Sequence, residues 1–584
     1  MTLVDKGKIE ASPGVDLDDR LRMVPGFTLF RRTSGVVANP TTQGISLRGI
    51  GSSGASRALL LWDGIPENDP FGGWVYWDRF APQELERVEI SRGASTSVFG
   101  DLALGGAIAL FSRPATNLFD LSYEGGSDNT HEVFTGFSRA WRRFAGSIES
   151  RAFRTDGYYI VPARLRGPVD RPAGVDFVAG DARLDYFTPT DRLFLRIDML
   201  AEHRENGTAL VKNGTGLGSI SGNYSHLWTH DEVSLLAYHT REGFHSIFSS
   251  IGAGRKTETL SFTQSVPSQA VGSAFLYRHD GGYWHVLAGA DFQRTQGVDT
   301  DHLVPTGLRI GGGIIWERGA FAQTDLKLGP VQLFAGSRFE LAGHSQFYSP
   351  SGGFTIGKQR WRARGSVYRA FRNPTLNELY RTFRQGNAIT QANAGLVPET
   401  LFGAEAGFDF VGEKTHASLT FYRNSLRNLI TNVTVQNGAT IIRQRQNGAA
   451  SLARGIEASL HRDWGDFQGE LSYLFADSRF ITGPRIAQVP RNQGTAQLSY
   501  RRKSTLISGG LRAYSLQFDD DLNQFVLPGF ATVGLAAKQT LTRHLTAHVA
   551  VDNLLGRQYL VALTPTPNTG SPLLVRVGLR LQLR

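Results

Sequence analysis

A glycine-rich segment at residues 49–54, GIGSSG, has the G-x-G-x-x-G spacing that can bind the phosphates of a dinucleotide. That chemistry requires a helix directly after the glycines, whose first backbone N–H groups point at the phosphate. The residues that follow, ASRALLLWDG, are apolar and predict a strand instead. We therefore interpret residues 49–54 as a loop and not as a nucleotide site.

Histidine and cysteine supply other common reactive groups, and neither is arranged here for catalysis. The chain has 14 His and no Cys, so thiol chemistry, disulfides and zinc–thiolate sites are excluded. His226 and His230 are four residues apart but have no carboxylate at metalloprotease spacing, and no G-x-S-x-G sequence is present. We interpret both histidines as loop residues, and we predict a protein that is not an enzyme and has no metal site and no cofactor.

The charge of the chain raises the question of a nucleic-acid partner. It is basic, with 62 Lys and Arg against 52 Asp and Glu and a net charge of +10. The arginines are scattered through the chain and form no block or stripe, so we expect no binding of nucleic acid. No stretch approaches the roughly 18 consecutive apolar residues of a membrane-spanning helix.

From residue 118 to the end, apolar and polar residues alternate with the period of two that predicts β-strands. In LFLRIDMLAE, Leu195, Ile197 and Met199 share one face, and Arg196 and Asp198 share the other. The segments LFGAEAGFDF and LLVRVGLRLQLR follow the same pattern. Several such segments have the length of a tilted strand that crosses a bilayer, roughly 9–11 residues.

The length of this region favours one large barrel over a soluble sandwich, which has the same alternation but ends after about 100 residues. We expect a short turn at FVGEKTH and long polar loops at 203–229 and 478–494. Short turns on one side and long loops on the other are typical of outer-membrane barrels. At roughly 20 residues per strand and connection, residues 118–584 predict a transmembrane antiparallel β-barrel of about 22 strands, whose lumen must be filled.

Residues 1–115 predict a small α+β domain of suitable size to fill that lumen. SPGVDLDDRLRMVPGF indicates a short helix that is capped by Asp16 and ends at Pro25-Gly26. GISLRG, RALLLWDGIP, LERVEIS and GGAIALFS indicate short strands. MTLVDKGKIE lacks the apolar core of a signal peptide, so we expect either a cytoplasmic protein or a chain that begins after, or without, its export signal.

Nine motifs carry a family resemblance. They are VPGFTLF, ISLRGIG, LLWDGIP, LERVEISRGASTSVFGDLALGGAI, FRNPTLNELY, LVPETLFGAEAGF, RGIEASL, VPRNQGTAQLSY and VDNLLGRQYL. In these segments the chain resembles the TonB-dependent outer-membrane transporters, in the family's order and over nearly the whole length. The resemblance implies a plug domain inside the barrel, with the loop at residues 49–54 facing the outside, and import of a bound ligand without chemical change.

The resemblance also assigns four charged residues. Arg48 and Arg92 match the family's plug arginines, and Glu405 and Glu457 match its barrel glutamates. Alternation independently places both glutamates on the lumen face. We predict that the four side chains anchor the plug to the barrel wall; the alternative is unrelated lumen charges that are solvated by trapped water.

The segment PENDPFGGWVYWDRF is too aromatic for an ordinary solvated loop. The resemblance makes its rings candidates for ligand contact: Phe71, Trp74, Tyr76 and Trp77. The alternative is that these rings pack the plug against the barrel. RGASTSVFGDLALGGAIALFSR resembles the turn-rich core of the plug, where glycine allows positive φ and close approach of strands. Its candidate turn glycines are Gly93, Gly100, Gly105 and Gly106.

These observations predict a monomeric receptor in the outer membrane of a Gram-negative bacterium. We expect it to import a ferric siderophore; cobalamin and an oligosaccharide are the alternative cargoes within the family. The resemblance implies coupling to the inner-membrane TonB complex, although no coupling segment is recognisable before SPGVDLDDRL and the chain ends in LQLR, without the family's usual terminal aromatic residue. A surface binding protein or passive channel without energy coupling is the second hypothesis, and a soluble multidomain β protein is the third.

Overall fold

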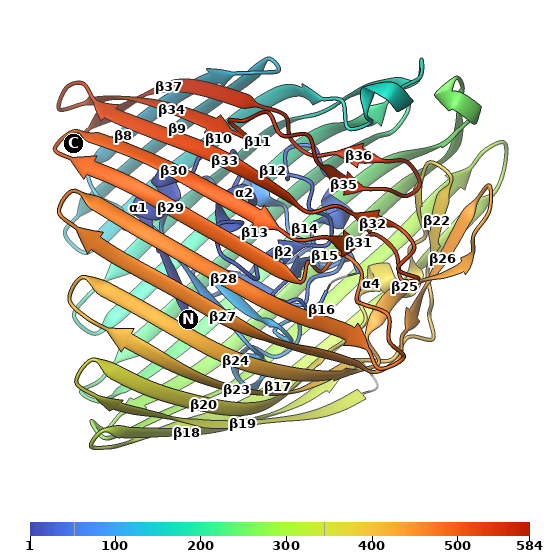
Figure 1. Ribbon diagram of the computed structural model, residues 1–584. Coiled ribbons are helices and arrows are strands. Elements are labelled where there is room, and N and C mark those ends of the chain that lie inside the picture. Colours follow the sequence, from blue (N-terminus) through green and yellow to red (C-terminus); the bar gives the residue numbers. More distant parts are fainter. Residues whose placement is uncertain (52, 344) are drawn as a thin grey trace.

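Strands dominate the computed structural model, which describes residues 1–51, 53–343 and 345–584. Within these residues, 22 antiparallel strands form a closed barrel, as predicted (Figure 1). β37 pairs with β8 and thereby closes the ring. The barrel strands are β8 (Leu118–Gly126), β9 (Thr130–Trp141), β10 (Phe144–Tyr158), β11 (Asp170–Phe187), β12 (Asp191–Thr208), β13 (Lys212–Leu227), β14 (Asp231–Ile251), β15 (Glu258–Asp280), β16 (Trp284–Leu303), β17 (Leu308–Leu328), β18 (Val331–Ala342), β19 (Ser345–Lys358), β20 (Trp361–Arg372), β23 (Glu399–Val411), β24 (Thr415–Arg427), β27 (Ser451–Trp464), β28 (Phe467–Phe480), β29 (Asn492–Arg502), β30 (Thr505–Tyr514), β33 (Phe530–Thr540), β34 (Leu545–Asp552) and β37 (Leu574–Leu583).

The alternating pattern has the predicted orientation. On β12, Leu195, Ile197 and Met199 point outward and are 51%, 60% and 60% exposed, whereas Arg196 and Asp198 point inward and are buried. Apolar residues therefore cover the outside of the barrel, and charged residues line the lumen. None of the helices formed by the described residues is long and apolar enough to span a membrane.

The two rims of the barrel differ in the length of their connections. One rim, on the left in Figure 1, has short turns such as residues 412–414 between β23 and β24. The other rim has long loops that contain further elements. These elements are η3 (Ala163–Leu165), η4 (Ala253–Arg255), α4 (Leu376–Tyr380), β21 (Phe383–Gln385), β22 (Ala388–Gln391), β25 (Ile430–Gln436), β26 (Ile441–Asn447), β31 (Gln517–Phe518), β32 (Val526–Leu527), β35 (Leu560–Ala562) and β36 (Asn568–Thr569).

The prediction of a long loop at residues 203–229 is wrong. β12 continues to Thr208 and β13 begins at Lys212, so only a short turn joins them. The polar, glycine-rich composition misled the prediction because Gly216 and Gly218 occupy outward positions of β13, where a strand tolerates the loss of a side chain. The connection within 478–494 is confirmed in part, since residues 481–491 lie outside barrel strands.

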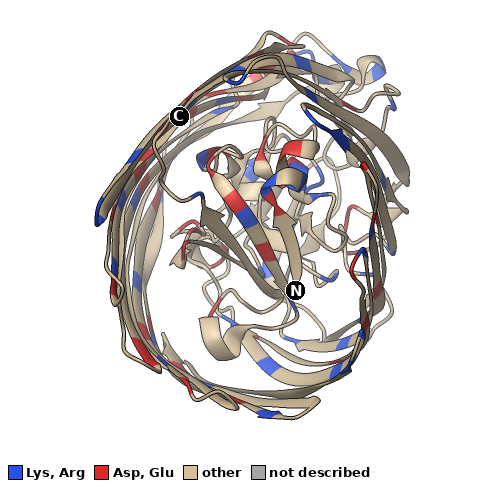
Figure 2. Cartoon of the chain, turned by 90° about the vertical axis from the view of Figure 1, so that its left-hand side faces the viewer, with Lys and Arg blue, Asp and Glu red and all other residues tan. Residues whose placement is uncertain are grey.

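The N-terminal domain lies inside the barrel (Figure 2) and is called the plug below. Its five-stranded sheet has the order β1-β6-β7-β4-β5. The elements of the plug are β1 (Thr2–Asp5), α1 (Lys6–Ala11), α2 (Leu17–Leu21), β2 (Thr28–Leu29), η1 (Pro40–Thr42), β3 (Ile45–Ser46), β4 (Leu59–Trp62), β5 (Ile65–Pro66), η2 (Trp77–Arg79), β6 (Leu85–Arg92), α3 (Thr96–Phe99) and β7 (Gly106–Ser112). The predicted helix after Asp16 is present, but it ends at Leu21 rather than at Pro25-Gly26, and the Asp16 side chain makes no capping hydrogen bond. The four predicted strands are all present.

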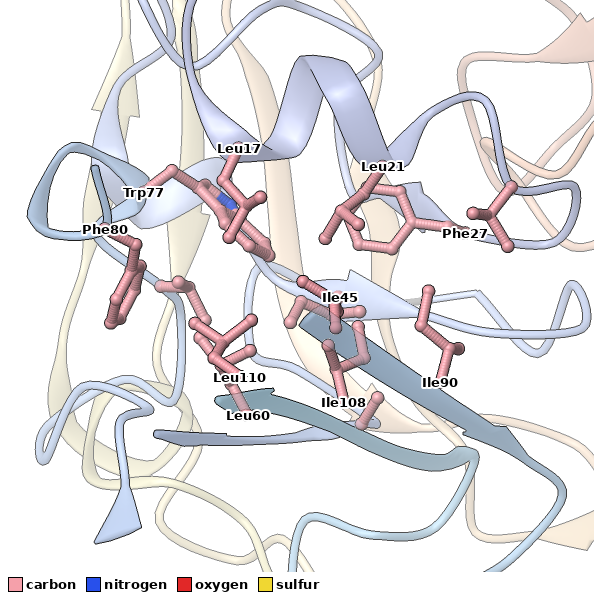
Figure 3. Close-up of a cluster of buried hydrophobic side chains, with 14 of the residues drawn as sticks. Leu17, Leu21, Phe27, Ile45, Leu60, Trp77, Phe80, Ile90, Ile108 and Leu110 are labelled. Atoms are coloured by element: carbon pink, nitrogen blue, oxygen red, sulfur yellow. The ribbon is translucent and has the colours of Figure 1, made fainter. Parts of the chain in front are cut away.

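One apolar core holds the plug together (Figure 3). α2 covers one face of the sheet with Leu17 and Leu21, both without exposed surface. Ile90 on β6 and Ile108 on β7 point at this helix from the sheet. All residues of this cluster belong to the plug, so the core is built without side chains of the barrel wall.

The four predicted turn glycines lie around β6, α3 and β7. Gly93, Gly100 and Gly106 have φ of 89°, 72° and 134°, which L side chains rarely adopt. A β-carbon on Gly106 would lie 2.1 Å from the carbonyl oxygen of Ser91. Gly105 has no positive φ, but a β-carbon there would lie 2.7 Å from Ile50 Cδ1. Gly106 therefore permits the close approach of β6 and β7, and Gly105 leaves room for Ile50.

Candidate functional site

The structure brings together the four charged residues that the sequence singled out. Arg48 lies in the loop after β3, and its side chain reaches the barrel wall. Its Nε and Nη2 donate to the two carboxylate oxygens of Glu457 on β27, at 3.2 and 3.0 Å. Its Nη1 donates to Glu405 on β23. Arg92 Nη1 lies 3.4 Å from Glu457 Oε1. The Arg48 guanidinium of the plug thus binds the carboxylates of Glu457 and Glu405 on the wall, and the Arg92 guanidinium also contacts Glu457.

The surroundings favour the charged form of Arg48. Burial opposes that form, but the carboxylates of Glu457 and Glu405 outweigh burial and hold the pKa of Arg48 above its ordinary value. Tyr422 stacks its ring 5.1 Å from the guanidinium and donates its hydroxyl to the Arg48 carbonyl, at 3.2 Å. The contacts orient the side chain as well as neutralise it, so the wall fixes the position of this plug loop.

A second and more deeply buried network was missed in the sequence. Arg57, at the start of the plug segment that contains β4, donates its Nε and Nη2 to Glu399 at the start of β23, at 3.0 and 2.6 Å. Arg372 Nε also donates to Glu399, at 2.6 Å, and its two Nη atoms donate to Glu378 of α4, both at 3.0 Å. The four side chains are at most 1% exposed. A signal was available, because FRNPTLNELY and LVPETLFGAEAGF contain three of the four residues.

Two further ion pairs, on β10 and β12, have the opposite polarity. Arg151 of β10 lies 2.9 Å from Asp16 of the plug, and Arg204 of β12 lies 2.6 Å from Asp78. In these two pairs the wall supplies the guanidinium and the plug supplies the carboxylate, whereas Asp198 of β12 accepts from Arg79 of the plug. Arg204 Nη1 also donates to the carbonyl of Ala38 at 3.1 Å, so it holds plug backbone as well.

The four aromatic side chains proposed as ligand contacts are all buried, with at most 3% of their surface exposed. Trp77 belongs to the core of the plug and packs edge-on against Phe27, with ring centroids 5.8 Å apart. Phe71, Trp74 and Tyr76 pack between the plug and the wall, where Tyr76 donates to Glu242 of β14 at 2.6 Å. These positions correspond to the packing alternative, and ligand contact by these rings stays a prediction.

The loop at residues 49–54 also contacts the barrel side. Ile50 packs in a cluster with Leu429, Ile486 and Val489, which come from barrel connections. Ser53 Oγ lies 2.5 Å from Glu378 Oε1 in the second charge network. Ser52 lies outside the described residues. This loop is therefore held at the wall, and no helix follows it.

His226 and His230, which are four residues apart in the sequence, do not form a common site among the described residues. His226 belongs to β13, where Nδ1 lies 2.7 Å from Asp191 Oδ1, so its interpretation as a loop residue is wrong. His230 lies in the turn before β14, as predicted.

A cavity of about 250 Å³ lies at the long-loop rim, between plug residues 31–42 and the barrel loops. We call it the outer cavity. Arg31, Arg255 and Arg384 line it, together with apolar groups such as Phe248 and Val561. A smaller cavity of about 40 Å³ shares Arg31 with it and is also lined by three further arginines: Arg381, Arg443 and Arg445. No acidic side chain lines either cavity among the described residues, so the lining is basic, although Arg31 and Arg255 are paired with Asp519 and Asp170 outside it.

A closed barrel that is filled by an ion-paired plug and has a basic cavity under its long loops defines a plugged outer-membrane transport barrel. The comparison with known families identifies which one. Residues 1–107 match the TonB-dependent Receptor Plug Domain, and residues 127–554 match the family described as TonB dependent receptor-like, beta-barrel. The chain belongs to the TonB-dependent receptor family.

Individual relatives are distant but cover most of the chain. An iron-regulated outer membrane virulence protein of Vibrio cholerae serotype O1 is 22% identical, over 96% of this chain and 88% of its own length. The ferric enterobactin receptor PirA of Pseudomonas aeruginosa is 24% identical, over 87% and 79%. The crystal structure of the siderophore receptor PirA from Acinetobacter baumannii is 17% identical and superposes with a TM-score of 0.80, over 100% of this chain and 98% of its own.

Proposed function

We propose that this protein takes up a ferric siderophore of net negative charge across the outer membrane of a Gram-negative bacterium. The chelate would bind at the long-loop rim, which faces outward in outer-membrane barrels. Displacement of the plug, driven by the TonB complex of the inner membrane, would then open a path to the periplasm. The observation that carries the proposal is the set of buried arginines without acidic partners beside the outer cavity.

Arg381, Arg443 and Arg445 are 1%, 8% and 4% exposed. Arg445 Nη1 donates to the backbone carbonyls of Asn377 and Arg381, at 2.7 and 2.6 Å, and Arg443 Nη2 donates to the Thr564 hydroxyl at 2.8 Å. None of the three forms an ion pair with a described residue. Burial lowers the pKa of Arg445 to about 10.

A buried guanidinium without a counter-ion raises the free energy of the empty receptor. An anionic ligand relieves that cost and gains charge-assisted hydrogen bonds, which guanidinium groups form readily with oxygen anions. Ferric chelates with catecholate, phenolate or carboxylate oxygens offer such anions. Cobalamin and neutral oligosaccharides, the alternative cargoes, offer little net negative charge. The cavity therefore favours the first ligand class.

The names of the relatives support iron as the cargo. One curated relative is called iron-regulated and another a ferric enterobactin receptor. At 22% and 24% identity these names support the class of ligand and leave the individual chelate open.

Binding to the purified full-length protein tests the proposal. Tryptophan fluorescence would be titrated with ferric enterobactin, with a neutral ferric trihydroxamate and with cyanocobalamin. We expect the anionic chelate to bind most tightly. The double variant R443Q/R445Q should weaken that binding by at least about tenfold, because two charge-assisted contacts are lost.

The matched control is R164Q, which removes an exposed arginine of η3 at the same rim but outside both cavities. Its affinity should equal that of the unaltered protein. Tightest binding of cyanocobalamin or of the neutral chelate would refute the proposed ligand class, as would equal losses of affinity in R164Q and R443Q/R445Q.

A further inference from the structure

Three acidic side chains meet between the plug and the wall, on the opposite side of the molecule from the outer cavity. They are Glu84, just before β6 of the plug, Glu149 of β10 and Asp181 of β11. One carboxylate oxygen from each lies within 4.8 Å of the others. Glu84 and Glu149 are 4% and 6% exposed, and Asp181 is partly buried.

Only one of the three has a basic partner. Arg113 donates its Nε and Nη2 to Glu149 Oε1, at 3.0 and 2.7 Å. Glu84 has no side-chain hydrogen bond and no ion pair with a described residue, and its Oε2 is fully buried without a partner. Asp181 likewise has neither kind of contact within the described part of the chain.

The other nearby arginines are committed elsewhere. Arg183 donates to Asp63 at 2.7 Å and to Asp185 at 2.7 Å. Arg196 also donates to Asp63. Glu84 and Asp181 therefore have no ion pair with a guanidinium of the described residues. Like charges held this close in a buried site require a proton or a cation between them.

We propose that Glu84, Glu149 and Asp181 form a binding site for one divalent cation with a preference for oxygen ligands, of the Ca²⁺ or Mg²⁺ class. Three carboxylates are a suitable ligand set for such an ion, and the site offers neither sulfur nor imidazole, which softer metals prefer. The two unneutralised charges match the charge of the ion. The ion would complete its coordination with water.

Space and access for that water are present. The three carboxylates line a cavity of about 600 Å³, which we call the inner cavity. Phe187, Thr188 and Arg192, at the short turn between β11 and β12, also line it. The inner cavity therefore lies at the short-turn rim, which faces the periplasm in outer-membrane barrels.

The site would act as a cross-link. Glu84 belongs to the plug, whereas Glu149 and Asp181 belong to the wall, so a bound ion would bridge the two domains beside the inner cavity. This role does not depend on which ligand enters at the outer cavity. The arginine contacts of the plug would then be supplemented by a contact that a chelator can remove.

Metal binding to the full-length protein tests the proposal. The protein, purified in detergent without a histidine tag and stripped with a chelator, would be titrated with Ca²⁺, Mg²⁺ and, as a spectroscopic probe, Mn²⁺. We expect one saturable site with a dissociation constant below about 1 mM, and weakening of at least about tenfold in E84Q and in D181N. The control is E86Q, which removes an exposed carboxylate two residues from Glu84 and should bind as the unaltered protein does.

The heat-modifiable gel mobility of each variant would establish that its barrel is folded. Because D181N changes the wall and E84Q changes the plug, one folded variant is sufficient for the comparison. Absence of saturable binding to the unaltered protein would overturn the proposal, and so would equal affinities of the unaltered protein, E84Q and D181N. Protons would then account for the neutralisation of these carboxyl groups.

Discussion

Replacement of Glu399 by glutamine should loosen the plug more than any change at an exposed ion pair. Glu399 accepts hydrogen bonds from Arg57 of the plug, from Arg372 and from the backbone N–H of Ile430, at 2.6 Å in each of these contacts. E399Q keeps the shape of the side chain but removes its charge. Arg372 retains Glu378 as a partner, whereas Arg57 would lose the only carboxylate that pairs with it among the described residues.

The magnitude follows from the burial of the pair. Neither Glu399 nor Arg57 has more than 1% of its side-chain surface exposed, so water cannot replace the lost partner. Removal of one member of a buried ion pair costs about 3–5 kcal/mol. Arg57 retains its hydrogen bond to the Ile430 carbonyl at 2.7 Å, which favours the lower value. About 3 kcal/mol corresponds to a change of about 100-fold in the population of the detached plug.

Hydrogen exchange followed by mass spectrometry measures that population. Asn377 is a suitable reporter, because its backbone N–H donates to the carbonyl of Phe71 across the plug–barrel boundary, at 2.8 Å. Peptides that contain β4 report the plug interior, and peptides from β14 and β15 report the barrel. In E399Q we expect exchange at Asn377 to be about 100-fold faster, with the barrel peptides unchanged.

The control is E413Q, in the short turn before β24. Glu413 lies 3.9 Å from Arg360, and the two side chains are 88% and 61% exposed. Such a pair contributes less than about 1 kcal/mol, so exchange should hardly change. Equal exchange rates in E399Q and E413Q would refute the reasoning, as would acceleration of the barrel peptides to the same extent as the plug peptides.

Three further predictions concern the plug and its boundary. The double variant E405K/E457K should loosen the plug, because it places cations beside the plug arginines. Increased sensitivity of cells to vancomycin would reveal the loosening. Unaltered sensitivity together with unaltered protection of the plug from hydrogen exchange would contradict the prediction. G106A should destabilise the plug by about 1–3 kcal/mol in chemical denaturation, because its φ of 134° and the nearby carbonyl leave no room for a methyl group. G438A, with no atom within 4 Å of the added carbon, should not. W77A should destabilise the plug by about 3–5 kcal/mol and leave the affinity for ferric chelate unchanged, whereas a tenfold weaker affinity of a folded W77A would favour ligand contact.

The barrel could be predicted from sequence because each strand repeats the same physical constraint. Alternation alone placed Ile197 outward and Arg196 inward on β12, and both positions are confirmed. The strand number followed from a mean spacing of roughly 20 residues per strand and connection, although individual barrel strands range from the 8 residues of β34 to the 23 residues of β15. The same reasoning failed at residues 203–229, where Gly216 and Gly218 leave the outward side of β13 without the apolar residues that mark a strand.

The contacts between the plug and the wall are harder to predict from the sequence than the strands are, because they join residues that are far apart in the chain. Glu399 lies 342 residues from Arg57, so no local pattern relates them, and only the closed ring brings them together. The proximity of Arg48 to Glu457 was accessible because both residues lie in motifs shared with a known family. The absence of an ion pair at Arg443 and Arg445 among the described residues could not be predicted from the sequence, because it depends on which side chains of distant loops lie beside them.

Ion pairs between the plug and the wall have opposite polarity on two sides of the lumen. β23 is the tenth strand after β11 in a ring of 22, so the two sectors lie nearly opposite each other. In one sector the wall offers Glu399 and Glu457 to plug arginines. In the other it offers Arg151 and Arg204 to plug aspartates, beside one pair of the first kind between Arg79 and Asp198. A plug turned by half a revolution would set its arginines against guanidinium groups and its aspartates against carboxylates. These four ion pairs therefore favour the observed rotational orientation of the plug over the one turned by half a revolution.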